Sequence, residues 1–246
     1  MLIIIGLLVA GVSVGTKLIH STKLRTIISD MQQYQTSLKT FKLSYDELPG
    51  DMKDSSALAF FGVTNATRRA SNGEIEGDGY INGLHEGPMA FWHMMLAGII
   101  SGSYDGVMID VEVPGKTIGD SRYSNNAGFN FFTLGLNWNQ WGYNAYSVYE
   151  KTGIIVLGFG AIKTSNSRLI EDAIISPVDA YTIDKKLDDG KPYSGRVMSD
   201  HGSDVGINNC TNLNGYGTDY VSATHGDITY KLTDTEQKCR MIFEIL

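Results

Sequence analysis

The first 48 residues carry one continuous helical pattern whose character changes along its length. Residues 1–16 contain no charged side chain, and Lys17 is the first charged residue. From Leu24 onward, apolar residues recur at alternating intervals of three and four, which places them on one face of a helix. These positions are Leu24, Ile27, Met31, Tyr34, Leu38, Phe41, Tyr45 and Leu48. Pro49 and Gly50 then stop the pattern, so we predict one helix of about 45 residues.

The apolar start of this helix distinguishes it from an ordinary core helix. At about 1.5 Å of rise per residue, residues 1–16 span about 24 Å, slightly less than the roughly 30 Å of a bilayer core. A cleavable secretory signal is the alternative, since residues 10–13 are small, but no Lys or Arg precedes the apolar run. No Pro or Gly lies between Thr16 and Leu48. The apolar run therefore continues unbroken into the amphipathic part, which favours a permanent anchor or packing element.

The remainder of the chain alternates short helical and strand-like segments. Helices are predicted at 88–100 and 177–187, the second starting at Ser176-Pro177 and capped by Gly190. Strand-like runs are expected at 106–113, 128–136, 143–149, 154–159 and 227–232. These segments predict an α+β fold, in which the long N-terminal helix packs on a globular head with an antiparallel sheet and short helices.

Composition and charge narrow the class of protein further. The chain of 246 residues is 42% hydrophobic and 19% charged, with a formal net charge of -7, so it has material for a real core. We divide it into an N-terminal helix, 1–48, and a globular head, 49–246. The acidic balance argues against a nucleic-acid partner, because phosphate contacts need clustered Lys and Arg. The Gly-rich and Asn-rich head is typical of an extracytoplasmic domain.

Four segments resemble the type IV pilin and type II secretion pseudopilin family. An apolar helix continuous with an amphipathic half is typical of that family, and MLIIIGLLVAG at 1–11 is similar to its hydrophobic stretch. YDELPGDM at 45–52 resembles its junction between helix and head. AFWHMMLAGIISGSY at 90–104 and AYTIDKKLDDGKPYSG at 180–195 resemble recurring blocks of prepilin-type proteins.

The resemblance implies a structural, non-enzymatic subunit held in the bacterial inner membrane, with its head in the periplasm or outside the cell. Its partners would be other pilin or pseudopilin subunits, packed through the N-terminal helix, and the large head favours a minor subunit. The family's basic leader, cleavage site and following glutamate are not in this sequence. We expect that Met1 is an internal start a few residues into the mature protein. The alternative is a variant that is not processed.

An acidic loop is the candidate metal site. Glu74, Glu76 and Asp78 alternate, Gly79 follows, and Glu86 lies further on. This spacing resembles the first half of an EF-hand-type loop and predicts a calcium site, although Glu74 replaces the usual Asp and Glu86 is one position late. Calcium is known in pseudopilin heads, which adds to the hypothesis. The alternative is a solvated acidic turn.

The two cysteines are predicted to form a disulfide. Cys210 and Cys239 lie in polar surroundings near the C-terminus, and two distant cysteines in an exported protein are more often bonded than free. Many pilins fix their C-terminal region with such a bond, so the resemblance agrees. The alternative is two unrelated buried thiols.

Enzymatic interpretations find little support. Residues 11–15 match the G-x-S-x-G pattern of hydrolases but lie inside the predicted apolar helix. His93 is expected to be a hydrogen-bonded core histidine. Asp184 and Asp188 share a helical face and would suit acid–base catalysis in a secreted hydrolase, but their Lys neighbours favour exposure to solvent.

An anchored glycan-binding protein is the other alternative. Four aromatic residues gather in one stretch and could stack on sugar rings or belong to a sheet, which we favour. They are Trp138, Trp141, Tyr143 and Tyr146.

Overall fold

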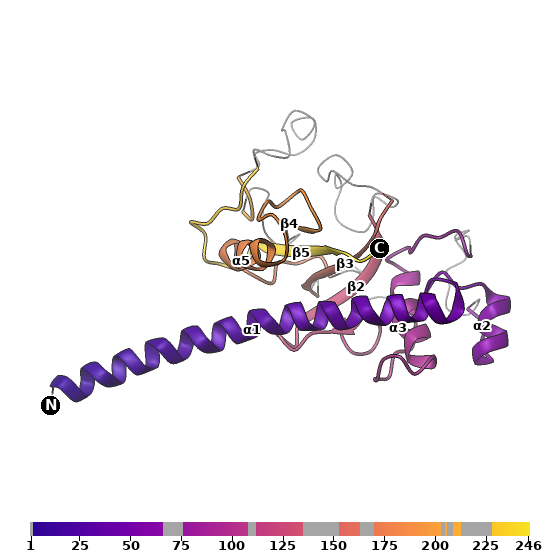
Figure 1. Cartoon of the computed structure of the whole chain (residues 1–246), viewed down its shortest axis with the longest axis horizontal. Coiled ribbons are helices and arrows are strands. Elements are labelled where there is room, and N and C mark those ends of the chain that lie inside the picture. Colours follow the sequence, from indigo (N-terminus) through magenta and orange to yellow (C-terminus); the bar gives the residue numbers. More distant parts are fainter. Residues whose placement is uncertain are drawn as a thin grey trace.

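The computed structural model confirms the α+β fold class (Figure 1). The structure describes residues 2–65, 76–107, 112–134, 153–162, 170–202, 205, 209–212 and 228–246, and for residues 2–10 the helical backbone alone. Within these residues, a long helix comes first, followed by a head with three short helices and a five-stranded antiparallel sheet. The predicted strand at 143–149 lies outside the described residues.

Helix α1 spans Leu2–Tyr45 and shares its apolar stripe with the core of the head. The predicted stripe positions from Leu24 to Phe41 are all buried, and Ile27, Leu38 and Phe41 are fully so. The helix ends three residues before Leu48, because Asp46 takes a left-handed conformation with φ 57°. The N-terminal part of α1 extends beyond the head (Figure 1).

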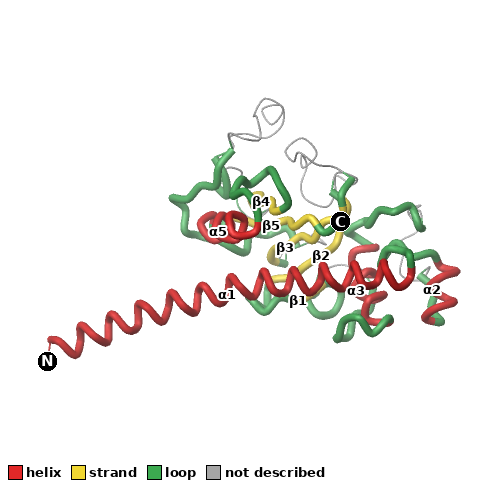
Figure 2. Tube along the Cα trace, viewed as in Figure 1, coloured by secondary structure: helices red, strands yellow, loops and turns green. Residues whose placement is uncertain are grey.

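The head contains a five-stranded sheet with an apolar layer on each of its faces. Its strands are β1 (Gly119–Asp120), β2 (Ala127–Thr133), β3 (Ile155–Ala161), β4 (Val197–His201) and β5 (Cys239–Glu244). Their order is β1-β2-β3-β5-β4, and every neighbouring pair is antiparallel. The tube view in Figure 2 shows α1 running past the strands.

Alternate residues of each strand face the two layers, as the period of two requires. On one face, Phe129 and Phe159 belong to the large cluster that includes the α1 stripe. On the other face, Phe132, Val156 and Ile242 form a second cluster with residues of the surrounding loops. Both faces of the central strands are therefore covered, which explains why β2 and β3 are buried along their whole length.

Two of the predicted strands are confirmed and two are wrong among the residues that are described. Runs 128–136 and 154–159 correspond to β2 and β3. In the run 106–113, the described residues form no strand, and in 227–232 the described pairing is an isolated bridge between Tyr230 and Thr211. Strands β1, β4 and β5 were not predicted.

The short helices agree in part with the predicted helix starts and ends. Helix α5, Pro177–Leu187, begins as predicted, with the Ser176 hydroxyl accepting the Asp179 N–H at 3.2 Å. Helix α3, Glu86–Leu96, starts two residues earlier than predicted. Helix α2, Asp54–Phe61, was not predicted. Gly190 has φ 77° but lies beyond the C-cap, and its N–H donates to the Asp184 carboxylate.

His93 is a hydrogen-bonded core histidine, as predicted. It is fully buried on α3, where its Nδ1 accepts the Gly50 N–H at 2.9 Å and its Nε2 lies 2.9 Å from the Asn65 Oδ1. This network assigns the proton to Nε2. The ring joins the helix-to-head junction to the core.

The predicted disulfide is confirmed. Cys210 and Cys239 are bonded, with their Cα atoms 5.0 Å apart and a separation of 29 positions in sequence. Both are fully buried, and the bond ties a loop to the first residue of β5. The C-terminal strand is therefore fixed covalently as well as by its two neighbouring strands.

Candidate functional site

The projecting part of α1 exposes large apolar side chains. Val12, Val14, Leu18 and Ile19 are each between 62% and 68% exposed, and Leu24 is the first buried residue of the stripe. Isolated surface apolar residues are ordinary, but contiguous ones mark an interaction surface. We call residues 11–23 the projecting segment.

The projecting segment and the turn that follows it are basic. Residues 1–29 contain no Asp or Glu, and they carry Lys17, Lys23 and Arg25. Asp30 is the first acidic residue of the chain. The segment therefore combines exposed apolar surface with a positive charge.

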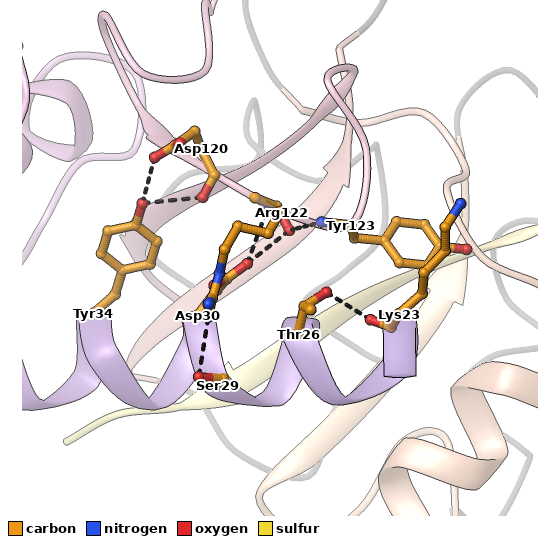
Figure 3. Close-up of polar contacts among 9 residues, drawn as sticks. Lys23, Thr26, Ser29, Asp30, Tyr34, Asp120, Arg122 and Tyr123 are labelled. Carbon is orange, nitrogen blue, oxygen red and sulfur yellow. Dashed lines mark hydrogen bonds and ion pairs between the residues drawn. The ribbon is translucent and has the colours of Figure 1, made fainter. Parts of the chain in front are cut away.

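Asp30 anchors the helix at the point where it meets the head (Figure 3). Its Oδ1 accepts the Nε–H and an Nη2–H of Arg122, each at 2.6 Å. Its Oδ2 accepts the Arg122 backbone N–H at 2.9 Å and the Ser121 hydroxyl at 3.1 Å. Asp30 is 5% exposed, so these four donors replace the water that its charge would otherwise need.

Tyr34 makes a second anchor one turn further along (Figure 3). Its hydroxyl lies 3.0 Å from both the backbone oxygen and the Oδ1 of Asp120, to which it donates. Burial raises the pKa of Tyr34 well above its usual range, and the neighbouring Tyr104 and Asp120 act in the same direction. The hydroxyl therefore stays protonated as a donor. The Tyr34 ring packs edge-on against Phe91 of α3, with centroids 5.3 Å apart.

Gly119 is required by this packing. A Cβ built on Gly119 would lie 2.6 Å from the Phe91 ring and 2.8 Å from the Tyr34 ring. Only a glycine lets β1 approach α1 this closely. In the sequence, this contact is marked by a single glycine between Ile118 and Asp120. That signal is too weak to predict the close approach of β1 to α1.

His20 forms a third contact between α1 and the head, nearer to the N-terminus than Asp30 and Tyr34. Its Nε2 lies 2.8 Å from the Oδ1 of Asp179 in the first turn of α5. Asp30, Tyr34 and His20 thus hold α1 at three successive levels to two separate parts of the head. The arrangement fixes the direction in which the projecting segment leaves the head.

The predicted calcium ligands are each engaged with a backbone N–H where they are described. Glu76 accepts from Asp54 at 2.8 Å, and Asp78 accepts from Tyr80 at 2.9 Å. Glu86 is buried and accepts from Asn82 at 2.8 Å. Glu74 lies outside the described residues. The calcium site of this loop stays a prediction.

Asp51, which sequence reasoning missed, organises this loop. Its carboxylate accepts the backbone N–H groups of Gly77 at 2.6 Å, Asp78 at 3.2 Å and Gly79 at 2.9 Å. Burial raises the pKa of Asp51 to about 6, although the three donors act in the opposite direction. Successive N–H groups that converge in this way form an anion-binding concavity, here filled by a side chain of the protein.

A second acidic group lies at the end of α5. The carboxylate oxygens of Asp184, Asp188 and Asp189 lie within 4.8 Å of one another and could hold a metal ion. The prediction that Asp184 is exposed was wrong, because it is fully buried and accepts the Tyr230 hydroxyl at 2.7 Å. Burial raises the pKa of Asp184 to about 7, and the charges of Asp189 and Asp188 add to this effect.

The other two members of this group pin the loop after α5. The Asp188 Oδ2 accepts the backbone N–H groups of Arg196 and Val197. Asp189 accepts the Lys191 N–H at 2.8 Å and the Ser194 hydroxyl at 2.6 Å. The loop is therefore folded around these carboxylates.

The aromatic residues of the glycan-binding alternative, Trp138, Trp141, Tyr143 and Tyr146, lie outside the described residues. Ser13 of the G-x-S-x-G pattern lies within α1, as expected.

Across the described part of the chain, no helix combines the length and the apolar character that crossing a membrane requires. No protein-family model, curated protein or solved structure matches this chain. The architecture itself defines a pilin-like class of protein, with a long N-terminal helix, an antiparallel sheet and a C-terminal disulfide. The disulfide indicates an extracytoplasmic location, because such bonds persist in oxidising compartments.

Proposed function

We propose that this chain is a non-enzymatic, membrane-anchored minor subunit of a type IV pilus or a type II secretion pseudopilus. The observation that carries the proposal is the division of α1 into a buried half and a projecting segment with exposed apolar side chains. Such a surface needs lipid or other apolar helices around it. The pilin-like architecture and the disulfide support the same conclusion.

The three anchors of α1 give this proposal its physical mechanism. Assembly exchanges the lipid contacts of the N-terminal helix for contacts with the helices of other subunits. Since Asp30, Tyr34 and His20 fix α1 to the head, packing of the helices also sets the orientation of the heads. The inner membrane holds the subunit before assembly, and the head lies in the periplasm or outside the cell.

Cross-linking in the host cell tests this function. A photoreactive amino acid replaces Val14 in the projecting segment, and the filaments are sheared from the cells and irradiated. We expect covalent adducts with other filament subunits. The matched control carries the same group in place of Leu232, which is 48% exposed on the head. A protein that stays out of the filament fraction, or adducts that depend equally on both positions, would overturn the proposal.

We also propose calcium as the ion for the acidic group of Asp184, Asp188 and Asp189. Three carboxylates supply the hard oxygen ligands that calcium prefers, and the loop that they pin is already folded. We expect calcium to raise the melting temperature relative to chelator, and Asp189→Asn to remove that rise. Asp78→Asn in the loop predicted from the sequence is the control. If Asp78→Asn alone removes the rise, the ion belongs to that loop instead.

A further inference from the structure

Three cations surround α1 where the projecting segment meets the head. Lys17, Lys23 and Arg25 are all exposed. At about 100° per residue, their directions around the helix axis lie roughly 80°, 120° and 160° apart, so they point to different sides of α1. Over these positions the helix rises about 12 Å, at about 1.5 Å per residue. We call the three residues the basic collar.

The charges of the basic collar are not balanced within the part of the chain that the structure describes. None of its three side chains forms an ion pair there. Two carboxylates lie against this part of α1, and both are already engaged. Asp30 pairs with Arg122 at 2.6 Å, and Asp179 pairs with His20 at 2.8 Å. The positive charge of the collar is therefore available to a partner outside the chain.

The rest of the chain has the opposite net charge. The formal net charge of the whole chain is -7, and residues 1–29 contribute three positive charges and no negative one, so residues 30–246 carry -10. A negatively charged surface would attract the collar and repel the rest of the molecule. Screening limits both effects to about 8–10 Å at physiological salt, so the attraction acts where the collar touches that surface. The charge distribution therefore orients the molecule with its collar toward an anionic surface.

Exposed apolar side chains lie at the level of the collar and on its N-terminal side. Leu18 and Ile19 are 66% and 62% exposed, and Val12 and Val14 are 66% and 68% exposed. Side chains of a helix lean toward its N-terminus, so those of the collar lean toward this apolar end. Lysine and arginine at such a boundary lay their aliphatic stems along apolar surface and keep their charge in the polar layer. The order along α1 is thus apolar, then basic, then the acidic head (Figure 1).

We propose that the basic collar binds the negatively charged headgroups of anionic lipids at a membrane surface. The proposal rests on the proposed function, because it takes the projecting segment as the part of the chain that contacts lipid. The headgroup layer is about 5–8 Å deep on each side of a bilayer, a depth that side chains leaning along about 12 Å of helix can share. A helix standing in this layer meets headgroups around its axis, which a ring of cations fits. A flat acidic protein surface would reach only one side of the ring.

Flotation of the full chain with lipid vesicles tests the contact. One set of vesicles is phosphatidylcholine, which is neutral overall, and the other contains added phosphatidylglycerol, which is anionic. Each cation at an anionic surface raises the binding constant about fivefold, so we expect the three to give roughly a hundredfold preference for the anionic vesicles at low salt. Added salt should reduce this preference, because it screens the charges.

The triple variant Lys17→Gln, Lys23→Gln, Arg25→Gln removes the collar. We expect it to bind the two kinds of vesicle about equally. All three positions are exposed, so the substitutions leave the core intact, and an unchanged melting temperature checks this.

The matched control removes the same charge elsewhere. Lys42→Gln, Lys53→Gln and Lys231→Gln together change three exposed lysines outside the collar and should preserve the preference. Equal binding of the unaltered protein to both kinds of vesicle would overturn the proposal, as would an equal loss of preference in the two triple variants. Either result leaves the anchoring in the proposed function standing, since the protein still binds lipid. Failure to bind either kind of vesicle would contradict that anchoring and the role of the collar together.

Discussion

Asp30 illustrates at the scale of one residue how a charge on α1 becomes an attachment point. A carboxylate on the buried side of a helix is costly unless donors surround it. Here Arg122 and Ser121 supply four donors from the segment after β1. The Arg122 side chain is partly exposed, so water screens part of the attraction between Arg122 and Asp30.

Replacing Asp30 with Asn keeps its shape and removes its charge. Asp30→Asn weakens the charge-assisted hydrogen bonds to Arg122, and we expect the free energy of unfolding to fall by about 2 kcal/mol. Urea unfolding measures this change. Asp46→Asn is the control, since Asp46 is exposed and Asn tolerates its positive φ, so its effect should stay within about 0.5 kcal/mol. Equal midpoints for the two variants would contradict the role of Asp30.

Asp184 makes stability depend on pH in the direction opposite to most carboxylates. Its pKa is raised from 3.8 to about 7 by burial, with the charges of Asp189 and Asp188 adding to the effect. The folded state therefore binds the proton more tightly than the unfolded state. This contribution to the free energy of unfolding is complete below about pH 4 and is lost as pH rises through about 7.

Asp184→Asn tests this dependence, because the amide cannot release a proton in that range. We expect the urea midpoint of the wild-type protein to fall more steeply between about pH 4 and about pH 7 than that of the variant, since these limits are close to the unfolded and folded pKa values of Asp184. Asp51, with a pKa of about 6, contributes the same sign in both proteins. Parallel curves for the two proteins would show that Asp184 titrates as in the unfolded chain.

At the scale of the element, α1 behaves as two helices joined end to end. Its buried half is stabilised by the core, whereas the projecting segment is largely exposed and contacts the head where His20 meets Asp179. Gly11 and Gly15 lie in this segment, and a Cβ built on either meets nothing within 4 Å. Since Gly disfavours helix by about 1 kcal/mol relative to Ala, these residues weaken the segment.

Gly15→Ala should therefore strengthen the projecting segment alone. We expect amide hydrogen exchange of residues around position 15 to slow by about fivefold, as about 1 kcal/mol of added helix propensity implies. Exchange of the amides near Leu38, which is fully buried, should not change. Slower exchange in both halves would mean that α1 opens as one unit.

The sequence predicted those elements whose signals are local. The stripe of α1, the Ser176 cap of α5 and the apolar runs of β2 and β3 are each readable within one segment. Helix α2 was missed because it has eight residues and is apolar on nearly every side. Strand β5 was missed because it contains Arg240, which is 2% exposed and lies 3.5 Å from Asp200 on β4.

The contacts that anchor α1 to the head were not predictable, because the partners are far apart in sequence. Asp30 and Arg122 are 92 residues apart in sequence, and their pairing depends on where the head meets the helix. Asp184 was assigned to the surface because its lysine neighbours are polar, whereas its partner Tyr230 is 46 residues away. Charge patterns show which side chains need partners, and the fold decides which partners they find.

At the scale of the whole molecule, the disulfide secures the C-terminal part of the sheet. Cys210 and Cys239 close a loop of 29 residues, and the chain-entropy model gives a contribution of about 3–4 kcal/mol for that length. The double variant Cys210→Ser, Cys239→Ser should lose that much free energy of unfolding in urea. The wild-type protein with reductant should match the variant. An unchanged midpoint in both cases would show that the sheet is held by its strand pairing alone.

The same bond determines how the molecule carries tension. When the chain is pulled from its two ends, the load passes directly from Cys210 to Cys239, and the residues between these two positions, which are 29 apart in sequence, bear none of it. At about 3.4 Å per residue, the loop removes roughly 100 Å from the length to which an unfolded head can extend. A head that is unfolded by tension with this bond intact is therefore a shorter tether, by roughly 100 Å, than its sequence alone implies.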